Sequence, residues 1–173
     1  MPLVVLGSAN LDHVHRVARI PAPGETVLAL DYRTFPGGKG LNQAVAAART
    51  APGTAFVTSL GRDAAGDELA GVLAEEPLEL AARRTDERTG TAQITVDDRG
   101  ENAIVVDSGA NAALLDLTAE ERTLIEGASA LLLQLEIPVA TVLEAARAGR
   151  PARSSTPPRS GRCRRSCSPR STC

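Results

Sequence analysis

The sequence predicts an α/β fold: a doubly wound sheet accompanied by a small β-sheet appendage. Short apolar runs alternate with helical, Ala-rich segments through residues 3–148, while a few further strand-like runs follow one another with no helix between them. Hydrophobic residues make up 43% of the chain but aromatic residues only 2%, so the core has to be built from Ala, Val, Leu and Ile. This composition suits aliphatic strands covered by Ala-rich helices.

The layered part of the fold is predicted from apolar runs and helix-start signals. The expected buried strands are the runs at residues 3–6, 54–59 and 130–135. The expected helices cover residues 38–49 and 65–80. Two more helices are expected to begin at Thr118, where Glu121 completes a capping box, and at Pro138, which suits a first helical turn.

Four strand-like runs are predicted to form the small β-sheet appendage. They cover about residues 11–20, 26–35, 91–96 and 102–106. Pro21-Ala-Pro-Gly-Glu joins the first two runs, and Asp97-Asp-Arg-Gly is the expected hairpin turn between the last two. We therefore assign residues 1–149 to one folded portion that includes this appendage.

Residues 150–173 differ sharply from the rest of the chain. They contain seven Arg, no acidic residue and all three cysteines, so the other 12 basic residues face all 21 acidic ones and residues 1–149 carry a net charge of −9. This Arg-, Ser- and Pro-rich tail lacks hydrophobic periodicity and is expected to be irregular. The negative body and the lack of aromatic residues in the tail argue against a nucleic-acid partner.

The N-terminal sequence MPLVVLGSANLD indicates a first β-strand, because it has no basic start of the kind that precedes a signal sequence. No segment approaches the length of a membrane span. We therefore expect a cytoplasmic location and no membrane partner.

Asn10 and Asp12 follow the first predicted strand directly. In open α/β sheets ligands bind at the carboxyl ends of strands. A carboxylate there can accept hydrogen bonds from neighbouring hydroxyl groups, and an amide can both donate and accept. An Asx turn leaving the strand is the alternative interpretation.

A Gly-rich helix start, Gly37-Gly38-Lys39-Gly40-Leu41-Asn42-Gln43, is the second candidate region. Its glycines let the backbone approach a polyhydroxy ligand closely, and the helix start offers free N–H donors. Asn42 would point from the first turn toward the same space. Glu136, at the end of the strand at 130–135, is a third candidate, with a solvated strand end as the alternative.

Other polar residues are interpreted as structural. Asp63, in the segment GRDAAGD, is expected to make a tight turn and cap the following helix. His13 and His15 lie two apart on one strand face and lack a third ligand, so no metal site is predicted. The chain has neither a Walker A motif nor a GxGxxG motif, and no catalytic residue is identified.

Taken together, these motifs resemble the ribokinase branch of the PfkB-type carbohydrate kinases. The resemblance implies a ribokinase-like doubly wound sheet, of which this chain carries the N-terminal portion, and it implies that the four appended strands are a small β-sheet lid. It extends from residue 3 to about residue 148 without a large gap. The matching segments are GSANLD (7–12), PAPGET (21–26), GGKGLNQAVAAAR (37–49), GRDAAGD (61–67), TGTAQITVDDRGENAIVVDSGAN (89–111) and LLLQLEIPVATVLEAA (131–146).

The resemblance also implies ATP-dependent phosphorylation of a sugar, with the 5-hydroxyl of D-ribose as the expected acceptor. The lid would close over the sugar to exclude water and would form the contact of a homodimer. ATP, Mg²⁺, a monovalent cation and the catalytic base would belong to the second half of the family fold, so this chain alone is expected to be inactive. By position, the sugar-binding residues would be Asn10, Asp12, Gly38, Lys39, Gly40, Asn42 and Glu136.

Two other functions remain open: a non-catalytic sugar-binding module, and a related kinase for another sugar or a nucleoside.

The tail also suggests a frameshift. If its Arg codons begin with CG and its Ser codons with TC, a reading frame one base earlier permits Val-Leu-Asn-Thr-Ala-Pro at residues 154–159. That sequence resembles the family's Leu-Asn-Pro-Ala-Pro segment, and residues 162–173 become an apolar helix pattern. We hypothesise a frameshift near residues 147–153.

Overall fold

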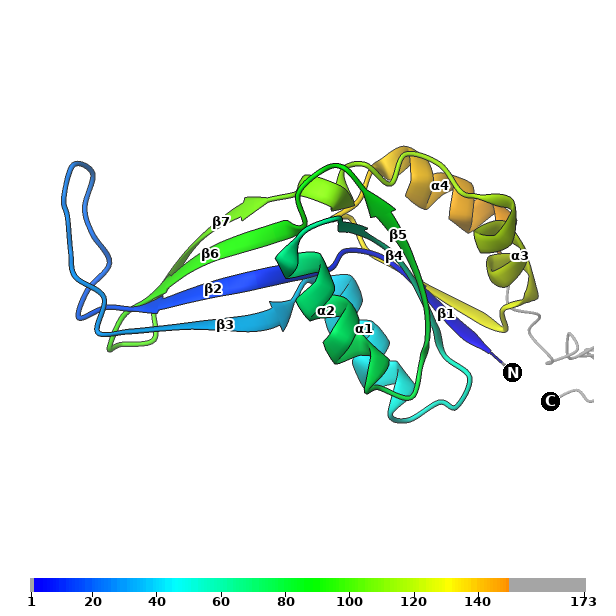
Figure 1. Cartoon of the computed structure of the whole chain (residues 1–173), viewed down its shortest axis with the longest axis horizontal. Coiled ribbons are helices and arrows are strands. Elements are labelled where there is room, and N and C mark those ends of the chain that lie inside the picture. The colour runs from blue at the N-terminus through cyan, green and yellow to red at the C-terminus, as the bar shows by residue number, and fades with distance from the viewer. Residues whose placement is uncertain (1, 150–173) are drawn as a thin grey trace, which may run out of the picture.

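The protein contains two four-stranded sheets, one in a layered body and one in an extension that projects from it (Figure 1). The computed structural model describes residues 2–149, and the predicted irregular tail at 150–173 lies outside the described residues. The α/β class with a separate small sheet is therefore confirmed. No helix among residues 2–149 is long and apolar enough to cross a membrane.

The body is built on a parallel sheet whose strand order is β5-β4-β1-β8. Every strand pair in it is parallel, which is the arrangement expected when helices connect the strands. Central strand β1 is short and almost fully buried. The strands are β1 (Leu3–Leu6), β4 (Ala55–Gly61), β5 (Glu79–Thr85) and β8 (Ala130–Leu133).

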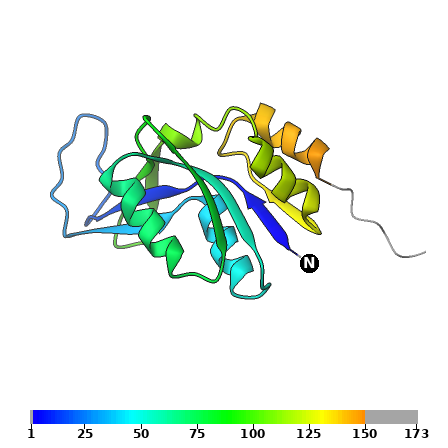
Figure 2. The same ribbon diagram turned by 45° about the vertical axis from the view of Figure 1, so that its right-hand side comes forward.

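Helices cover both faces of this sheet, so the sheet is doubly wound (Figure 2). Alternate residues of β1 point to opposite faces. Val5 packs in a cluster with residues of α1 (Lys39–Ala48) and α2 (Ala64–Ala74). Val4 and Leu6 pack in a second cluster with residues of α3 (Ala119–Gly127) and α4 (Val139–Ala148).

The lid is a mixed sheet of order β3-β2-β6-β7. Its strands are β2 (Asn10–Arg16), β3 (Asp31–Gly37), β6 (Gly90–Val96) and β7 (Asn102–Asp107). β2 follows β1 after three residues, so the end of the central body strand leads directly into the lid (Figure 1). This connection puts the start of the lid at the carboxyl edge of the parallel sheet.

The first two lid strands are shorter or shifted relative to the sequence prediction. The runs expected at residues 11–20 and 26–35 are strands only over β2 and β3. β2 ends opposite Val96, the last residue of β6, because β6 turns back there through a tight turn. Gly100 N–H donates to Asp97 C=O at 3.0 Å in that turn, as the sequence predicted.

The predicted helix at residues 65–80 was wrong beyond Ala74. Helix α2 ends there, and residues 79–85 form edge strand β5, which the sequence prediction missed. Pro77 cannot supply the N–H that a continuing helix needs. Strand β5 instead pairs with β4 over its whole length.

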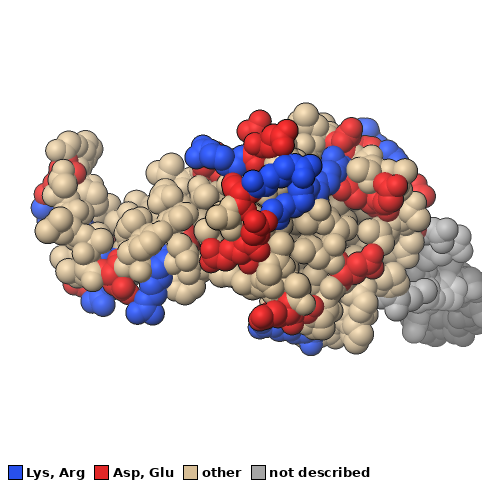
Figure 3. Space-filling view, viewed as in Figure 1, with Lys and Arg blue, Asp and Glu red and all other residues tan. Residues whose placement is uncertain are grey.

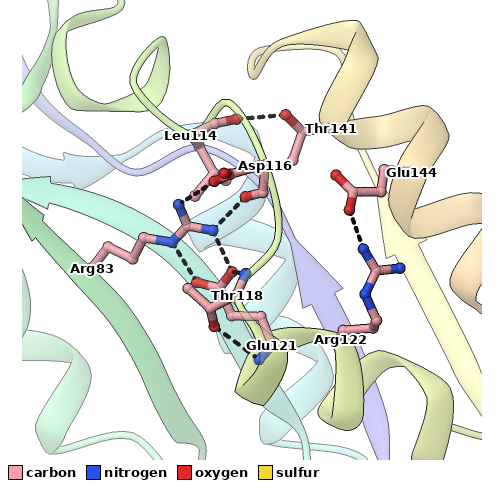
Figure 4. A network of polar contacts seen from close by, with 8 residues as sticks. All are labelled: Arg83, Leu114, Asp116, Thr118, Glu121, Arg122, Thr141 and Glu144. Atoms are coloured by element: carbon pink, nitrogen blue, oxygen red, sulfur yellow. Dashed lines mark hydrogen bonds and ion pairs between the residues drawn. The ribbon is translucent and has the colours of Figure 1, made fainter.

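Arg83 on β5 anchors the segment that leads from the lid to α3 (Figure 4). Its guanidinium donates to Glu121 Oε1 at 2.7 Å and to Asp116 Oδ1 at 3.1 Å. Glu121 is buried and also completes the predicted capping box with Thr118. The arginine is thus a structural link between β5, α3 and the residues before α3.

Candidate functional site

Three chain segments meet at the carboxyl edge of the parallel sheet. The first runs from the end of β1 into β2, the second from the end of β3 into α1, and the third leaves β8. Asn10, the first residue of β2, pairs with Gly37 at the end of β3 and with Gly90 at the start of β6. The predicted site residues on these segments are therefore brought to one edge.

The Asp12 carboxylate is buried without a hydrogen-bond donor for one of its oxygens, and its pKa is raised. Its Oδ1 is fully buried and has no hydrogen-bond partner, and among the described residues it is the only carboxylate oxygen in that state. Burial raises the pKa of Asp12, the negative charge of Glu136 raises it further, and His13 lowers it. A buried acceptor without a donor is costly, and Oδ1 of Asp12 contributes no hydrogen bond to the described fold.

Gly37 makes room for that carboxylate. A Cβ at position 37 would overlap the Asp12 side chain, with Oδ1 only 2.5 Å away. The next residue, Gly38, has φ of 91° and precedes α1. That left-handed backbone favours glycine, because a side chain there is strained.

Helix α1 begins in close contact with the loop between β1 and β2. Gly40 N–H donates to Ser8 Oγ at 3.3 Å, and Leu41 N–H donates to Ser8 C=O at 2.8 Å. A Cβ at Gly40 would lie 2.6 Å from Ser8 O, so only glycine fits. The Gly-rich motif is thus needed for packing, whatever its role toward a ligand.

Lys39 and Glu136 form an ion pair across the site. Lys39 N–H donates to Glu136 Oε2 at 3.1 Å, and the Ser8 hydroxyl donates to the same oxygen at 2.7 Å. Burial alone would raise the pKa of Glu136, but these hydrogen bonds outweigh it and hold the pKa below its usual value. Glu136 is therefore ionised at neutral pH, close enough to raise the pKa of Asp12.

The Asn42 side chain makes no hydrogen bond to the other predicted site residues. It is exposed on the first turn of α1. It lines a surface hollow of about 330 Å³ with Pro36 from β3, Val45 and Arg49 on or beside α1, and Val72 from α2.

Two residues of this region were missed by the sequence prediction. Ser8 is fully buried and contacts both Glu136 and α1, although it lies inside the GSANLD motif. Asn111 follows β7 in a short 3₁₀ helix, Gly109–Asn111, and donates from Nδ2 to Asn10 Oδ1 at 2.7 Å. Only its place in the matching segment that ends in SGAN could have drawn attention to it.

The residues interpreted as structural are placed outside this constellation. Asp63 caps α2 by accepting from Gly66 N–H at 2.8 Å, as predicted, and it also accepts from the Thr89 N–H at 2.8 Å. His13 bonds to Tyr32 through its ring, and His15 packs against the same tyrosine. No group of three or more metal-binding side chains occurs in the part of the chain that the structure describes.

Charged side chains on the body are largely paired. Figure 3 shows positive and negative groups intermixed over one face. Arg62, Arg84 and Arg88 each lie within ion-pair distance of an aspartate. Each of these arginines is therefore paired with an acidic side chain.

The protein is therefore of the α/β class, with a doubly wound sheet and a lid. Its polar candidate site lies beside the lid, where the unpartnered Asp12 carboxylate stands at the strand ends. The model of the pfkB family of carbohydrate kinases matches residues 2–158. The chain belongs to this family.

Individual relatives narrow the similarity to ribokinases. The chain is 41% identical over 143 residues to the ribokinase of Haemophilus influenzae, covering 81% of this chain and 47% of that protein. The crystal structure of Thermotoga maritima ribokinase matches with a TM-score of 0.77 and 39% identity, over 84% of this chain and 48% of the other.

A ribokinase of Arabidopsis thaliana solved with ribose and ATP matches with a TM-score of 0.73 and 34% identity. The alignment covers 85% of this chain and 49% of that one. The chain spans about half the length, or less, of the curated relatives it matches.

Proposed function

We propose that this chain supplies the sugar-binding part of a ribokinase-type kinase, which transfers a phosphoryl group from ATP to the 5-hydroxyl of D-ribose. The observation that carries the proposal is the buried, unpartnered Oδ1 of Asp12 at the carboxyl edge of the sheet. A sugar hydroxyl is a donor that would satisfy this oxygen. The Arabidopsis relative solved with ribose and ATP supports ribose as that sugar.

Each remaining site residue has a proposed role toward the sugar. Asn10 offers its amide beside Asp12, and Glu136 accepts further hydroxyls while Lys39 balances its charge. Gly38 and Gly40 keep the start of α1 free of side chains next to the ligand. Asn42 is proposed to contact the sugar from the first turn of α1.

The nucleotide side of the reaction is assigned to the part of the relatives that this chain does not span. ATP, Mg²⁺, a monovalent cation and the catalytic base are all proposed to belong there. Phosphoryl transfer needs a positioned nucleophile and charge stabilisation together. We therefore expect the 173-residue chain to bind the sugar without phosphorylating it.

The lid is proposed to close over the sugar and to join two copies of the protein. On the lid face that carries Asp12, register places Phe35 opposite Asp12 and Ile104 opposite Ile94. Phe35 and Ile104 are about half exposed (47% and 51%). Burying such a face against a second lid would be favourable. Sedimentation should show dimers that Ile104→Lys dissociates, and a monomeric unaltered chain would refute this.

A titration of the chain with D-ribose, with and without ATP, tests the proposed function. We expect binding that ATP does not change, and no ADP release in a coupled assay. Turnover would refute the assignment of catalysis to the other half. Binding of a nucleoside or another sugar instead of ribose would favour the related-kinase alternative.

A cytoplasmic location remains part of the proposal and is tested by cell fractionation.

The frameshift hypothesis for residues 150–173 is tested separately by resequencing the gene beyond codon 147. A corrected frame that encodes Val-Leu-Asn-Thr-Ala-Pro after α4 would support it. A gene sequence that encodes the printed tail would refute it.

A further inference from the structure

Asn111 is a buried amide beside the start of β2, and its side chain is fully engaged. It is 2% exposed. Its Oδ1 accepts from Ala9 N–H at 2.9 Å, while its Nδ2 donates to Ala9 C=O at 3.2 Å and to Asn10 Oδ1 at 2.7 Å. The segment that follows β7 thereby bonds to the loop that enters β2, about one hundred residues earlier.

The backbone fixes the polarity of this chain of bonds. The N–H of Ala9 can only donate and its C=O can only accept, so the Asn111 amide has one permitted orientation. Nδ2 of Asn111 must then face Asn10 as a donor. The Asn10 atom opposite it must be the acceptor Oδ1.

The amino group of Asn10 consequently faces away from Asn111. Within residues 2–149 no group accepts a hydrogen bond from it, and it is not among the fully buried atoms that lack a partner. It is therefore open to a ligand. Asp12 lies two residues along the same strand and on the same face, with its unpartnered carboxylate oxygen.

We infer that Asn111 is a positioning residue that sets the Asn10 amide as a hydrogen-bond donor toward the ligand. The site then presents a donor at Asn10 beside an acceptor at Asp12. It therefore selects a polyhydroxy ligand with two neighbouring oxygens. One of them accepts a hydrogen bond from the Asn10 amino group, and the other, a hydroxyl, donates a hydrogen bond to Asp12. This inference rests on the proposed function and narrows what the same site recognises.

Gly90 provides the space that this amide pair needs. A Cβ at position 90 would overlap both Asn111 Nδ2 and Asn10 Oδ1, and would lie 3.0 Å from Ser108 O. Gly90→Ala should therefore displace the amide pair without changing a single polar group. It offers a second way to disturb the Asn10 orientation.

The orientation can be tested without any sugar, by side-chain amide hydrogen exchange in nuclear magnetic resonance of the full chain. The Asn111 Nδ2 protons should exchange more slowly than those of Asn10, because both residues are buried but only the Asn111 amino group donates hydrogen bonds. Asn111→Asp keeps the acceptor for Ala9 N–H but removes the donor. In that variant the Asn10 amide should turn, and its protons should become protected.

The consequence for recognition is tested by D-ribose titration. Asn111→Asp and Gly90→Ala should each weaken ribose binding by about tenfold, the scale of one lost hydrogen bond. Asn10→Asp should do the same while leaving the Asn111 protons protected, since it keeps the acceptor for Asn111. Asn102→Asp makes the same chemical change at an exposed lid position and should bind normally.

Two results would overturn the inference. One is equal protection of the Asn10 and Asn111 amide protons in the unaltered chain. The other is a folded Asn111→Asp variant that binds ribose as tightly as the unaltered chain. If the unaltered chain binds no ribose, the proposed function fails, and the exchange measurement alone decides whether Asn111 sets the Asn10 orientation.

Discussion

The Ser8 hydroxyl donates a hydrogen bond to Glu136 Oε2 at 2.7 Å, although 128 residues separate them in sequence. The bond joins the loop after β1 to the segment after β8, two neighbouring strands of the parallel sheet. Ser8 is fully buried. The position of the Glu136 carboxylate is therefore fixed by the fold before any ligand binds.

Removing this bond should affect both stability and binding. We expect Ser8→Ala to lower the free energy of unfolding by about 1 kcal/mol. It should also weaken ribose binding, because Glu136 loses a donor and its pKa moves back up. Urea denaturation and calorimetry measure the two effects. Ser129→Ala, which removes an exposed bond to Pro2 C=O, is the matched control. Unchanged ribose affinity in Ser8→Ala would contradict the role given to this bond.

Asp12→Asn should make the protein more stable at pH 7. The pKa of Asp12 is raised in the folded state, mainly by burial and then by the charge of Glu136. A group of this kind favours folding while protonated, and the contribution is lost as the pH rises from the unfolded value of 3.8 through the folded pKa. The gain in Tm should therefore shrink toward pH 3.8. If Asp12→Asn melts at a lower temperature than the unaltered chain at pH 7, the predicted stabilisation is refuted.

Asp63→Asn should change the stability at pH 7 in the opposite direction from Asp12→Asn. Burial alone would raise the pKa of Asp63, but hydrogen bonds from Thr89 and Gly66 hold it below its usual value. The stabilisation is present above the unfolded pKa and is lost as the pH falls through the folded pKa. Asp63→Asn should lower the free energy of unfolding at pH 7 by about 1–3 kcal/mol. Thermal melts across pH measure it, and a variant as stable as the unaltered chain at pH 7 would be inconsistent with this capping role.

Replacing Gly37 by alanine should damage the candidate site, whereas replacing Gly71 by alanine should stabilise the protein. Gly37→Ala should disrupt the site, because its Cβ overlaps the Asp12 carboxylate. Gly71→Ala lies inside α2 with no atom near the added Cβ, so it should raise the free energy of unfolding by about 0.5–1 kcal/mol. Chemical denaturation and ribose titration of both variants check this. Normal binding by Gly37→Ala would show that the close approach is dispensable.

Features with a local cause could be predicted from sequence. The capping box at Thr118, the Asp63 cap and the turn at Asp97 each depend on residues within a few positions, and the structure confirms them. Strand β5 could not be predicted in this way. Its sequence, ELAARRT, has an apolar run of only three residues, and it is held as a strand by pairing with β4 and by the bond from Arg83 to Glu121.

The same distinction applies to the candidate site. Asp12 and Glu136 were predicted because polar residues directly after apolar strands mark the sheet's carboxyl edge. The unpartnered state of Asp12 depends on Gly37, which approaches it only through strand pairing. Asn111 reaches Asn10 across 101 residues, and no local pattern in the sequence encodes that contact.

The central claim is that Asp12 is a ligand-binding group and Asp63 a structural one, and D-ribose titration of Asp12→Ala and Asp63→Ala tests it most directly. Each charge-assisted hydrogen bond lost at Asp12 costs about 1.5–3 kcal/mol, so two of them imply a loss of affinity on the order of a hundredfold or more. We expect Asp12→Ala to lose ribose binding while it stays folded, and Asp63→Ala to melt at lower temperature while it still binds. Normal ribose binding by Asp12→Ala, or lost binding by an Asp63→Ala variant with unchanged melting, would contradict the account.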